Sequence, residues 1–71
     1  TIRPVMRVKI NGQPMTVEAG TNVEQLLTQV SLSPGPCAVE RNGDLVPWKQ
    51  RETVVLHDGD CIEIVTLVGG G

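Results

Sequence analysis

Apolar and polar positions alternate near both ends of this sequence. Residues 6–10 and 15–18 each alternate with a period of two, which is typical of strands with one buried face. Asn11 and Gly12 lie between them, and an Asn-Gly pair between two alternating runs is a strong signal for a tight hairpin. Residues 61–68 form a further predicted strand. The pattern therefore predicts an antiparallel hairpin at the start of the chain and a strand near its end.

A helical period replaces this alternation after Gly20. Thr21, followed three residues later by Glu24, predicts a capping box, in which each side chain bonds the other residue's backbone N–H. Pro34 and Pro36 cannot lie inside a helix or a central strand, so the helix is expected to end before them. The apolar positions recur at i, i+3, i+4 and i+7, which indicates one apolar stripe of a helix: Val23, Leu26, Leu27 and Val30.

The second half of the chain carries shorter strand signals. Residues 38–41 and 45–46 predict two short strands around a second Asn-Gly turn, and the apolar residues 53–56 are a candidate for a third. Residues 47–50 predict an irregular crossover. A hairpin, one helix and later strands on the same sheet form the β-grasp arrangement. We therefore predict an α+β fold with a mixed four- to five-stranded sheet and one main helix packed on one face.

The last strand has two unlike faces, because successive side chains point to opposite sides of a strand. The two sets are Ile62, Ile64, Thr66 and Val68 on one face, and Cys61, Glu63, Val65 and Leu67 on the other. The first set begins with apolar residues only, so we expect it to meet the helix. Val65 and Leu67 would then lie on the open face, either as an ordinary exposed pair or as the edge of a docking patch.

Three glycines follow this strand: Gly69, Gly70 and Gly71. Glycine has no Cβ, so the tail is expected to be thin and flexible. Two interpretations stay open at this point, a frayed terminus or a terminal carboxylate offered to a narrow active site on another protein. We expect one domain over residues 1–68, with residues 1–5 as an extension or a cloning remnant.

Composition narrows the class of protein. The chain has 71 residues, 39% of them apolar, with no Phe or Tyr and one Trp, which suits one small domain with an aliphatic core. A net charge of −2 and a pI near 5.1 argue against nucleic-acid binding. No membrane span or signal peptide is evident, so the cytoplasm is the expected location. The predicted core residues are Val8, Ile10, Val17, Leu26, Leu27, Val39, Ile62 and Ile64.

Few other residues of the sequence suggest a chemical or binding role. Cys37 and Cys61 are too few for a disulfide framework or a four-cysteine cluster, and we expect small buried hydrophobes, with sulfur relay as the alternative for Cys37. His57 has too few neighbouring ligands for a metal site. Trp48 is expected to cover the open end of the core, with a partner anchor as the alternative. The acidic residues form either a solvated surface or the complement of a basic partner: Glu40, Asp44, Glu52, Asp58, Asp60 and Glu63.

Several features, taken in order, match one family. They are Asn11-Gly12, the helix with Leu26-Leu27, Val39-Glu40-Arg41-Asn42 before Val46-Pro47, His57-Asp58-Gly59-Asp60 before the last strand, and the terminal glycines. From Met6 onward the chain resembles the ThiS family, the ubiquitin-like β-grasp sulfur carriers of thiamin biosynthesis. The family signature is a Gly-Gly end, whereas this chain has three glycines.

The resemblance implies chemistry at Gly71. A ubiquitin-activating-like enzyme, using ATP and Mg²⁺, would adenylate its carboxylate, and a sulfur donor would displace AMP and leave a thiocarboxylate. Thiazole synthase would then receive the sulfur. The chain itself would be a carrier rather than an enzyme, with no bound cofactor. The tail residues are Gly69 and Gly70, and the candidate partner-binding residues at its base are Val65, Leu67 and Val68.

Three other functions share part of this pattern. The small subunit of molybdopterin synthase has the same fold and tail but is normally longer. A ubiquitin-like modifier would end in an isopeptide bond to a lysine. A plain β-grasp interaction module would carry a tail without a function.

Overall fold

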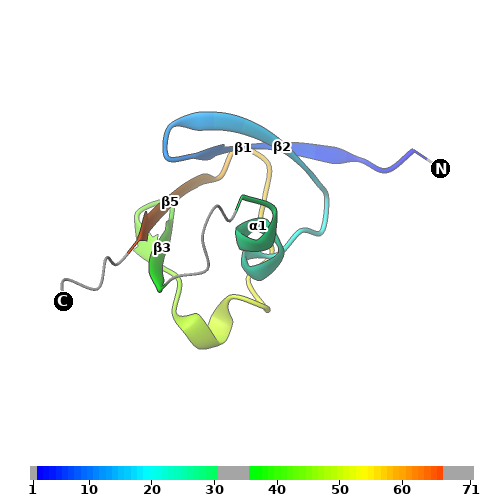
Figure 1. The fold of residues 1–71 in the computed structure, drawn as a ribbon. Helices are drawn as coiled ribbons and strands as arrows, with labels where there is room; N and C mark the ends of the chain where they lie inside the picture. Colours follow the sequence, from blue (N-terminus) through cyan, green and yellow to red (C-terminus); the bar gives the residue numbers. More distant parts are fainter. Residues whose placement is uncertain (1, 31–35, 67–71) are drawn as a thin grey trace.

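The computed structural model describes residues 2–30 and 36–66 of the chain. Figure 1 shows a small sheet with one main helix against it. The elements, in chain order, are β1 (Val5–Ile10), β2 (Gln13–Glu18), α1 (Val23–Val30), β3 (Cys37–Arg41), β4 (Asp44–Leu45), the short 3-10 helix η1 (Trp48–Gln50) and β5 (Cys61–Thr66).

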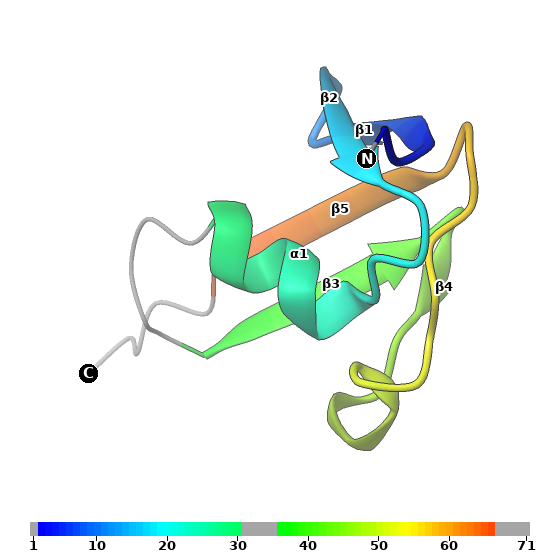
Figure 2. The same ribbon diagram turned by 90° about the vertical axis from the view of Figure 1, so that its right-hand side faces the viewer.

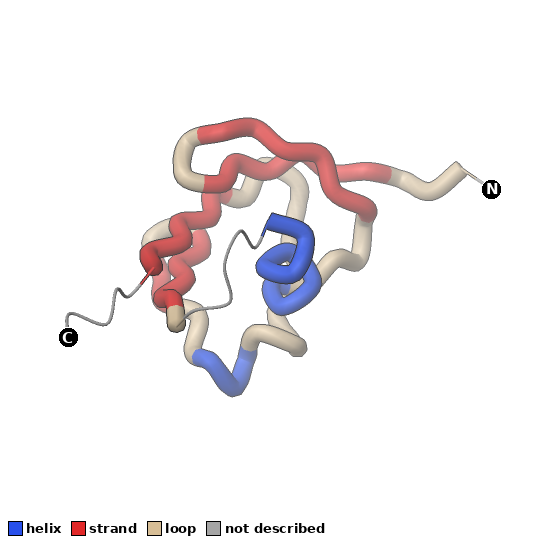
Figure 3. The backbone as a smooth tube through the Cα atoms, in the orientation of Figure 1, coloured by secondary structure: helices blue, strands red, loops and turns tan. Residues whose placement is uncertain are grey.

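The five strands form one mixed sheet in the order β2-β1-β5-β3-β4. The central pair, β1 and β5, is parallel, and the remaining neighbours are antiparallel. The strands curve around α1 (Figure 3), and α1 lies across β3 and β5 on one side of the sheet (Figure 2). The prediction of an α+β β-grasp fold, with one helix on one face of a mixed sheet, is confirmed.

Both predicted Asn-Gly turns are present. Asn11 and Gly12 have φ of 50° and 82°, and Asn42 and Gly43 have φ of 52° and 88°. Two successive residues with positive φ belong to the hairpin turn whose twist matches that of the flanking strands, and Asn and Gly tolerate it best. These turns fix the registers of β1 with β2 and of β3 with β4.

The hydrophobic core lies between α1 and the sheet. Its fully buried apolar members are Val8, Val17, Val23, Leu26, Val39, Val46, Leu56 and Ile62. Five of the predicted core residues are among them, while Ile10, Leu27 and Ile64 are half-buried and pack against its margin. The short helix points Leu26 at the sheet centre and leaves Leu27 at the side of the stripe.

The N-terminus of α1 is capped one residue later than predicted. The Gln25 backbone N–H donates to Asn22 Oδ1 at 2.7 Å, and the Asn22 backbone N–H donates to Gln25 Oε1 at 3.0 Å. This reciprocal pair is the capping box, so the prediction of Thr21 and Glu24 was wrong. Thr21 is buried, and its hydroxyl donates instead to the Glu18 carbonyl at 2.6 Å, which closes the turn that precedes the helix.

Residues 53–56 belong to the connection before β5 and form no strand of the sheet. Their one ladder contact is an isolated bridge between Val55 and Asn22. The Val54 carbonyl accepts from the Val23 N–H at 3.0 Å, and the Arg51 carbonyl accepts from the Glu24 N–H at 2.9 Å. The apolar character of this segment therefore comes from docking beside the helix N-terminus, where Leu56 enters the core.

Candidate functional site

The predicted reactive end follows β5 in sequence. Gly71 and the tail residues Gly69 and Gly70 lie outside the described residues, as do Leu67 and Val68. What the structure describes is the base from which the tail departs, which is β5 with its neighbours in the sheet.

The two faces of β5 are assigned as the sequence predicts. Ile62 is buried and Ile64 half-buried against the core below α1. Val65 points to the other side and is 55% exposed. Of the predicted partner-binding residues, Val65 is the one within the described range, and it lies on the open face of the sheet.

The side chain of Asn11 ties β5 to the first hairpin. Its Nδ2 donates to the Ile64 carbonyl at 3.1 Å, and its Oδ1 accepts from the Ile64 N–H at 2.7 Å. The amide thus imitates a backbone unit and extends the parallel β1–β5 ladder beyond its last backbone pair, Ile10 with Ile62. Sequence reasoning recognised Asn11 for its turn conformation and missed this second role.

A second contact holds the sheet beside the end of β5. Cys37 lies opposite Thr66, the last described residue of β5. Arg51 Nη2 donates to the Cys37 carbonyl at 2.6 Å, and the Arg51 guanidinium carbon lies 4.7 Å from the centre of the Trp48 ring. Arg51 is only 5% exposed, whereas Trp48 is 73% exposed. The expectation that Trp48 covers the core was therefore wrong, because the ring covers Arg51 instead.

The open face next to the end of β5 combines apolar and acidic side chains. The register places Glu40 opposite both Glu63 and Leu45, and Ala38 opposite Val65. Opposite residues share a face, so β3, β4 and β5 present one continuous surface on the side away from α1. We call it the open-face patch, and it consists of Ala38, Glu40, Leu45, Cys61, Glu63 and Val65.

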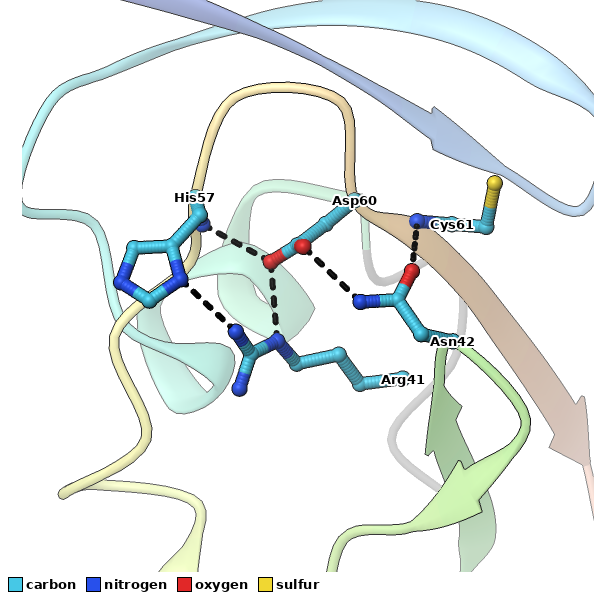
Figure 4. A network of polar contacts seen from close by, with 5 residues as sticks. All are labelled: Arg41, Asn42, His57, Asp60 and Cys61. Carbon is cyan, nitrogen blue, oxygen red and sulfur yellow. Dashed lines mark hydrogen bonds and ion pairs between the residues drawn. The ribbon is translucent and has the colours of Figure 1, made fainter.

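A polar network fixes the other end of β5, at Cys61 (Figure 4). Asp60 accepts hydrogen bonds from Arg41 Nε at 2.9 Å, from Asn42 Nδ2 at 3.0 Å and from the His57 backbone N–H at 2.8 Å. Asn42 Oδ1 also accepts from the Cys61 N–H at 2.9 Å. The network joins the β3–β4 turn, the loop before β5 and β5 itself.

The environment of Asp60 favours its charged form. Burial by itself would raise the pKa of this carboxyl, but the hydrogen bonds from His57, Asn42 and Arg41 and the positive charge of Arg41 outweigh it. The net effect holds the pKa of Asp60 below its ordinary value. Because Asp60 is only 5% exposed, its inclusion in an acidic docking surface was wrong. Its role in the fold is structural.

The remaining candidate residues either have structural roles or lie on the surface. Asp58 Oδ1 accepts from the Arg7 backbone N–H at 2.8 Å, and His57 Nδ1 accepts from Arg41 Nη2 at 2.8 Å, so both residues belong to the turn before β5. Cys37 is half-buried at the margin of the core, whereas Cys61 is exposed, so the expectation of a buried hydrophobe was wrong for Cys61. Both thiols are free.

Two other kinds of site are absent from the described residues. Within residues 2–30 and 36–66, no three His, Cys, Asp or Glu side chains converge as they would around a metal ion. Neither helical segment of that same part of the chain is long and apolar enough to span a bilayer.

Comparison with known proteins assigns this chain to a family. The fold and the exposed face beside β5 define a ubiquitin-like β-grasp domain. The model of the ThiS family matches residues 8–71. The chain belongs to the ThiS family.

Relatives and solved structures agree with this assignment. The sulfur carrier protein ThiS of Escherichia coli is 32% identical over 66 residues, which cover 93% of this chain and all of that protein. A crystal structure of the thiamine biosynthesis protein ThiS from Geobacter metallireducens superposes with a TM-score of 0.80 at 30% identity, over 93% of this chain and all of that one.

Other relatives are much longer than this chain. A thiazole synthase of Magnetococcus marinus is 42% identical and one of Paramagnetospirillum magneticum is 39% identical, each over 66 residues. In both cases the match covers 93% of this chain but 20% of the relative, so the chain spans a fifth of the length of those proteins.

Proposed function

We propose that this chain carries sulfur as a thiocarboxylate on Gly71. A free carboxylate is a poor electrophile, so it must first be activated. A ubiquitin-activating-like enzyme transfers AMP from Mg²⁺-bound ATP to the carboxylate, which forms an acyl-adenylate and releases pyrophosphate. Hydrosulfide then attacks the acyl carbon, a C–S bond forms, and AMP departs with the broken C–O bond. A persulfide donor would give an acyl disulfide, which a thiol reduces to the same thiocarboxylate.

The observation that carries this proposal is that the family match runs through the terminal glycines to residue 71. A chain of glycines fits a narrow active site because it presents no side chains. Ordering three such residues costs roughly 1–2 kcal/mol each, so the folded domain must contribute binding free energy of its own. The exposed Val65 on the strand that precedes the tail is well placed to do so.

We propose thiazole synthase as the acceptor of the sulfur. Two relatives of this chain are named thiazole synthase, and each contains a segment similar to it within a longer protein. Joining a carrier-like segment and a synthase in one chain raises their effective concentration. In this account the separate chain is a co-substrate of the activating enzyme and of the synthase, rather than a catalyst.

Pyrophosphate exchange tests the first step. The activating enzyme from the same organism, with labelled pyrophosphate and Mg²⁺-ATP, should exchange label into ATP when the full chain is added. A chain lacking Gly70 and Gly71 should not support this exchange. Its denaturant melt should match that of the full chain, because the described core residues lie between Val8 and Ile62. Equal exchange by both chains would contradict adenylation at Gly71.

A further inference from the structure

Two glutamates face each other on the open-face patch. Glu40 on β3 lies directly opposite Glu63 on β5. Val39 and Ile62, their sequence neighbours, are buried against the core, so alternation turns both carboxylates to the face away from α1. Directly opposite residues in an antiparallel pair have Cβ atoms about 4.5–5.5 Å apart, and like charges at that spacing destabilise a sheet.

In the described part of the chain, neither glutamate forms an ion pair with a cation. Its two ion pairs join Arg3 to Glu18 and Arg41 to Asp60, and the buried Arg51 is directed to the Cys37 carbonyl. Lys9 lies beside Cys61 in the parallel ladder and forms no ion pair with either glutamate. Within the described residues, the two carboxylates therefore face each other without a direct ion-pair partner.

Apolar groups lie on two sides of this pair of carboxylates. Leu45, 63% exposed, lies opposite Glu40 on the outer side, and Val65 with Ala38 forms the next cross-strand pair toward the tail. A charged contact framed by apolar side chains loses water when a partner covers it, and it then contributes more than the same contact at a wet rim. Two negative charges in an apolar frame are complementary to one positive group with an apolar stem.

We propose that one arginine or lysine side chain of the activating enzyme binds between Glu40 and Glu63. This inference rests on the proposed function and names the chemistry of the surface that docks there. Docking would relieve the repulsion that the free protein carries, which favours a basic partner over a neutral one. The activating enzyme is the favoured partner because it must hold the phosphates of ATP and the tail carboxylate together, which requires a cationic surface. Glu63 lies on the strand that leads into the tail and thus reaches the rim of such a site.

The test compares E40Q, E63Q and the double variant with E52Q as a matched control. Glu52 is an exposed acid whose backbone carbonyl accepts from Asn22 Nδ2 beside the start of α1, away from the open-face patch. Calorimetry with the activating enzyme should show each patch variant binding about 10-fold more weakly and with less dependence on salt, while E52Q binds like the wild type. The double variant should lose less than the product of the two single losses, because both carboxylates contact one side chain.

A stability measurement separates docking from folding. Denaturant melts should show E40Q and E63Q at least as stable as the wild type, since removing one charge relieves the repulsion. E63K would place opposite charges across the strands, so it should raise stability and abolish binding. Weaker binding by a variant that also unfolds more easily would contradict the proposal, because the glutamates would then act through the fold.

Further outcomes distinguish this inference from the proposed function. One outcome is that the wild type is adenylated normally and the patch variants bind the activating enzyme as tightly as the wild type does. The docking proposal is then wrong, and the proposed function stands. If the wild type is neither bound nor adenylated, both are wrong. Weaker binding to thiazole synthase alone, or an equal loss with E52Q, would also overturn the assignment of this contact to the activating enzyme.

Discussion

The guanidinium of Arg51 donates a 2.6 Å hydrogen bond to the carbonyl of Cys37, the residue that lies opposite Thr66. The contact joins the loop after η1 to the sheet beside the end of β5. The same loop caps α1, since the Arg51 carbonyl accepts from the Glu24 N–H. One residue therefore links the helix, the η1 segment and the base of the tail.

Replacing Arg51 should destabilise the protein without altering its surface. R51M keeps the apolar stem but leaves the Cys37 carbonyl without its partner, at a cost of about 2 kcal/mol in unfolding free energy. The buried Nε has no hydrogen-bond partner, so its removal relieves a desolvation cost and offsets part of this loss. K49M, at an exposed position of η1, is the control for the loss of one charge. Equal denaturant midpoints for R51M and K49M would show that the Arg51–Cys37 hydrogen bond adds nothing to stability.

The two leucines on the apolar stripe of α1 should lose different amounts of unfolding free energy when each is replaced by alanine. Leu26 is fully buried, so L26A should cost about 3–5 kcal/mol through lost transfer free energy and a cavity. Leu27 is half-buried at the core margin, so L27A should cost roughly half as much. Denaturant melts of the two variants check the order. A larger loss for L27A would mean that the helix is rotated relative to this structure.

The Asp60 network predicts a particular dependence of stability on pH. The pKa of Asp60 is lowered in the folded state, so its contribution is present above the unfolded-state pKa of about 3.9 and is lost as pH falls through the folded value. D60N lacks this charge and should be less stable than the wild type by about 2 kcal/mol at neutral pH. The difference should shrink below about pH 4. A difference that stays constant from pH 7 to about pH 2 would contradict the account.

Val65 should matter for docking and little for folding. V65K places a charge on the open-face patch and should weaken association with the activating enzyme by about 2 kcal/mol, as hot-spot substitutions do. The free energy of unfolding should change little because the site is 55% exposed. Val55 is also partly exposed but lies beside the start of α1, so V55K is the matched control. If V65K binds normally, the docking surface lies elsewhere.

Local patterns in the sequence predicted the parts of this fold that depend on near neighbours. The Asn-Gly turns, the helix stripe and the two faces of β5 each follow from a short-range rule about φ, helical period or strand alternation. Burial of Ile62 and exposure of Val65 are confirmed for that reason. The fold class then followed from the order of the elements.

The missed features depend on contacts between distant parts of the chain. Asn11 reaches Ile64, and Arg51 reaches Cys37, across loops that no periodicity describes. Asp60 looked like surface charge because its partners come from another turn. The capping box shifted to Asn22 because the Thr21 hydroxyl is used by Glu18. Each case involves a polar side chain whose partner could not be read from its own segment.

The mass of the C-terminal peptide tests the central claim most directly. The chain is incubated with activating enzyme, Mg²⁺-ATP and a sulfur donor, then digested and analysed by mass spectrometry beside a chain lacking Gly70 and Gly71. One oxygen should be replaced by one sulfur in the peptide that ends at Gly71, and the truncated chain should gain none. Sulfur found on Cys37 or Cys61 instead, or an equal gain in the truncated chain, would contradict it.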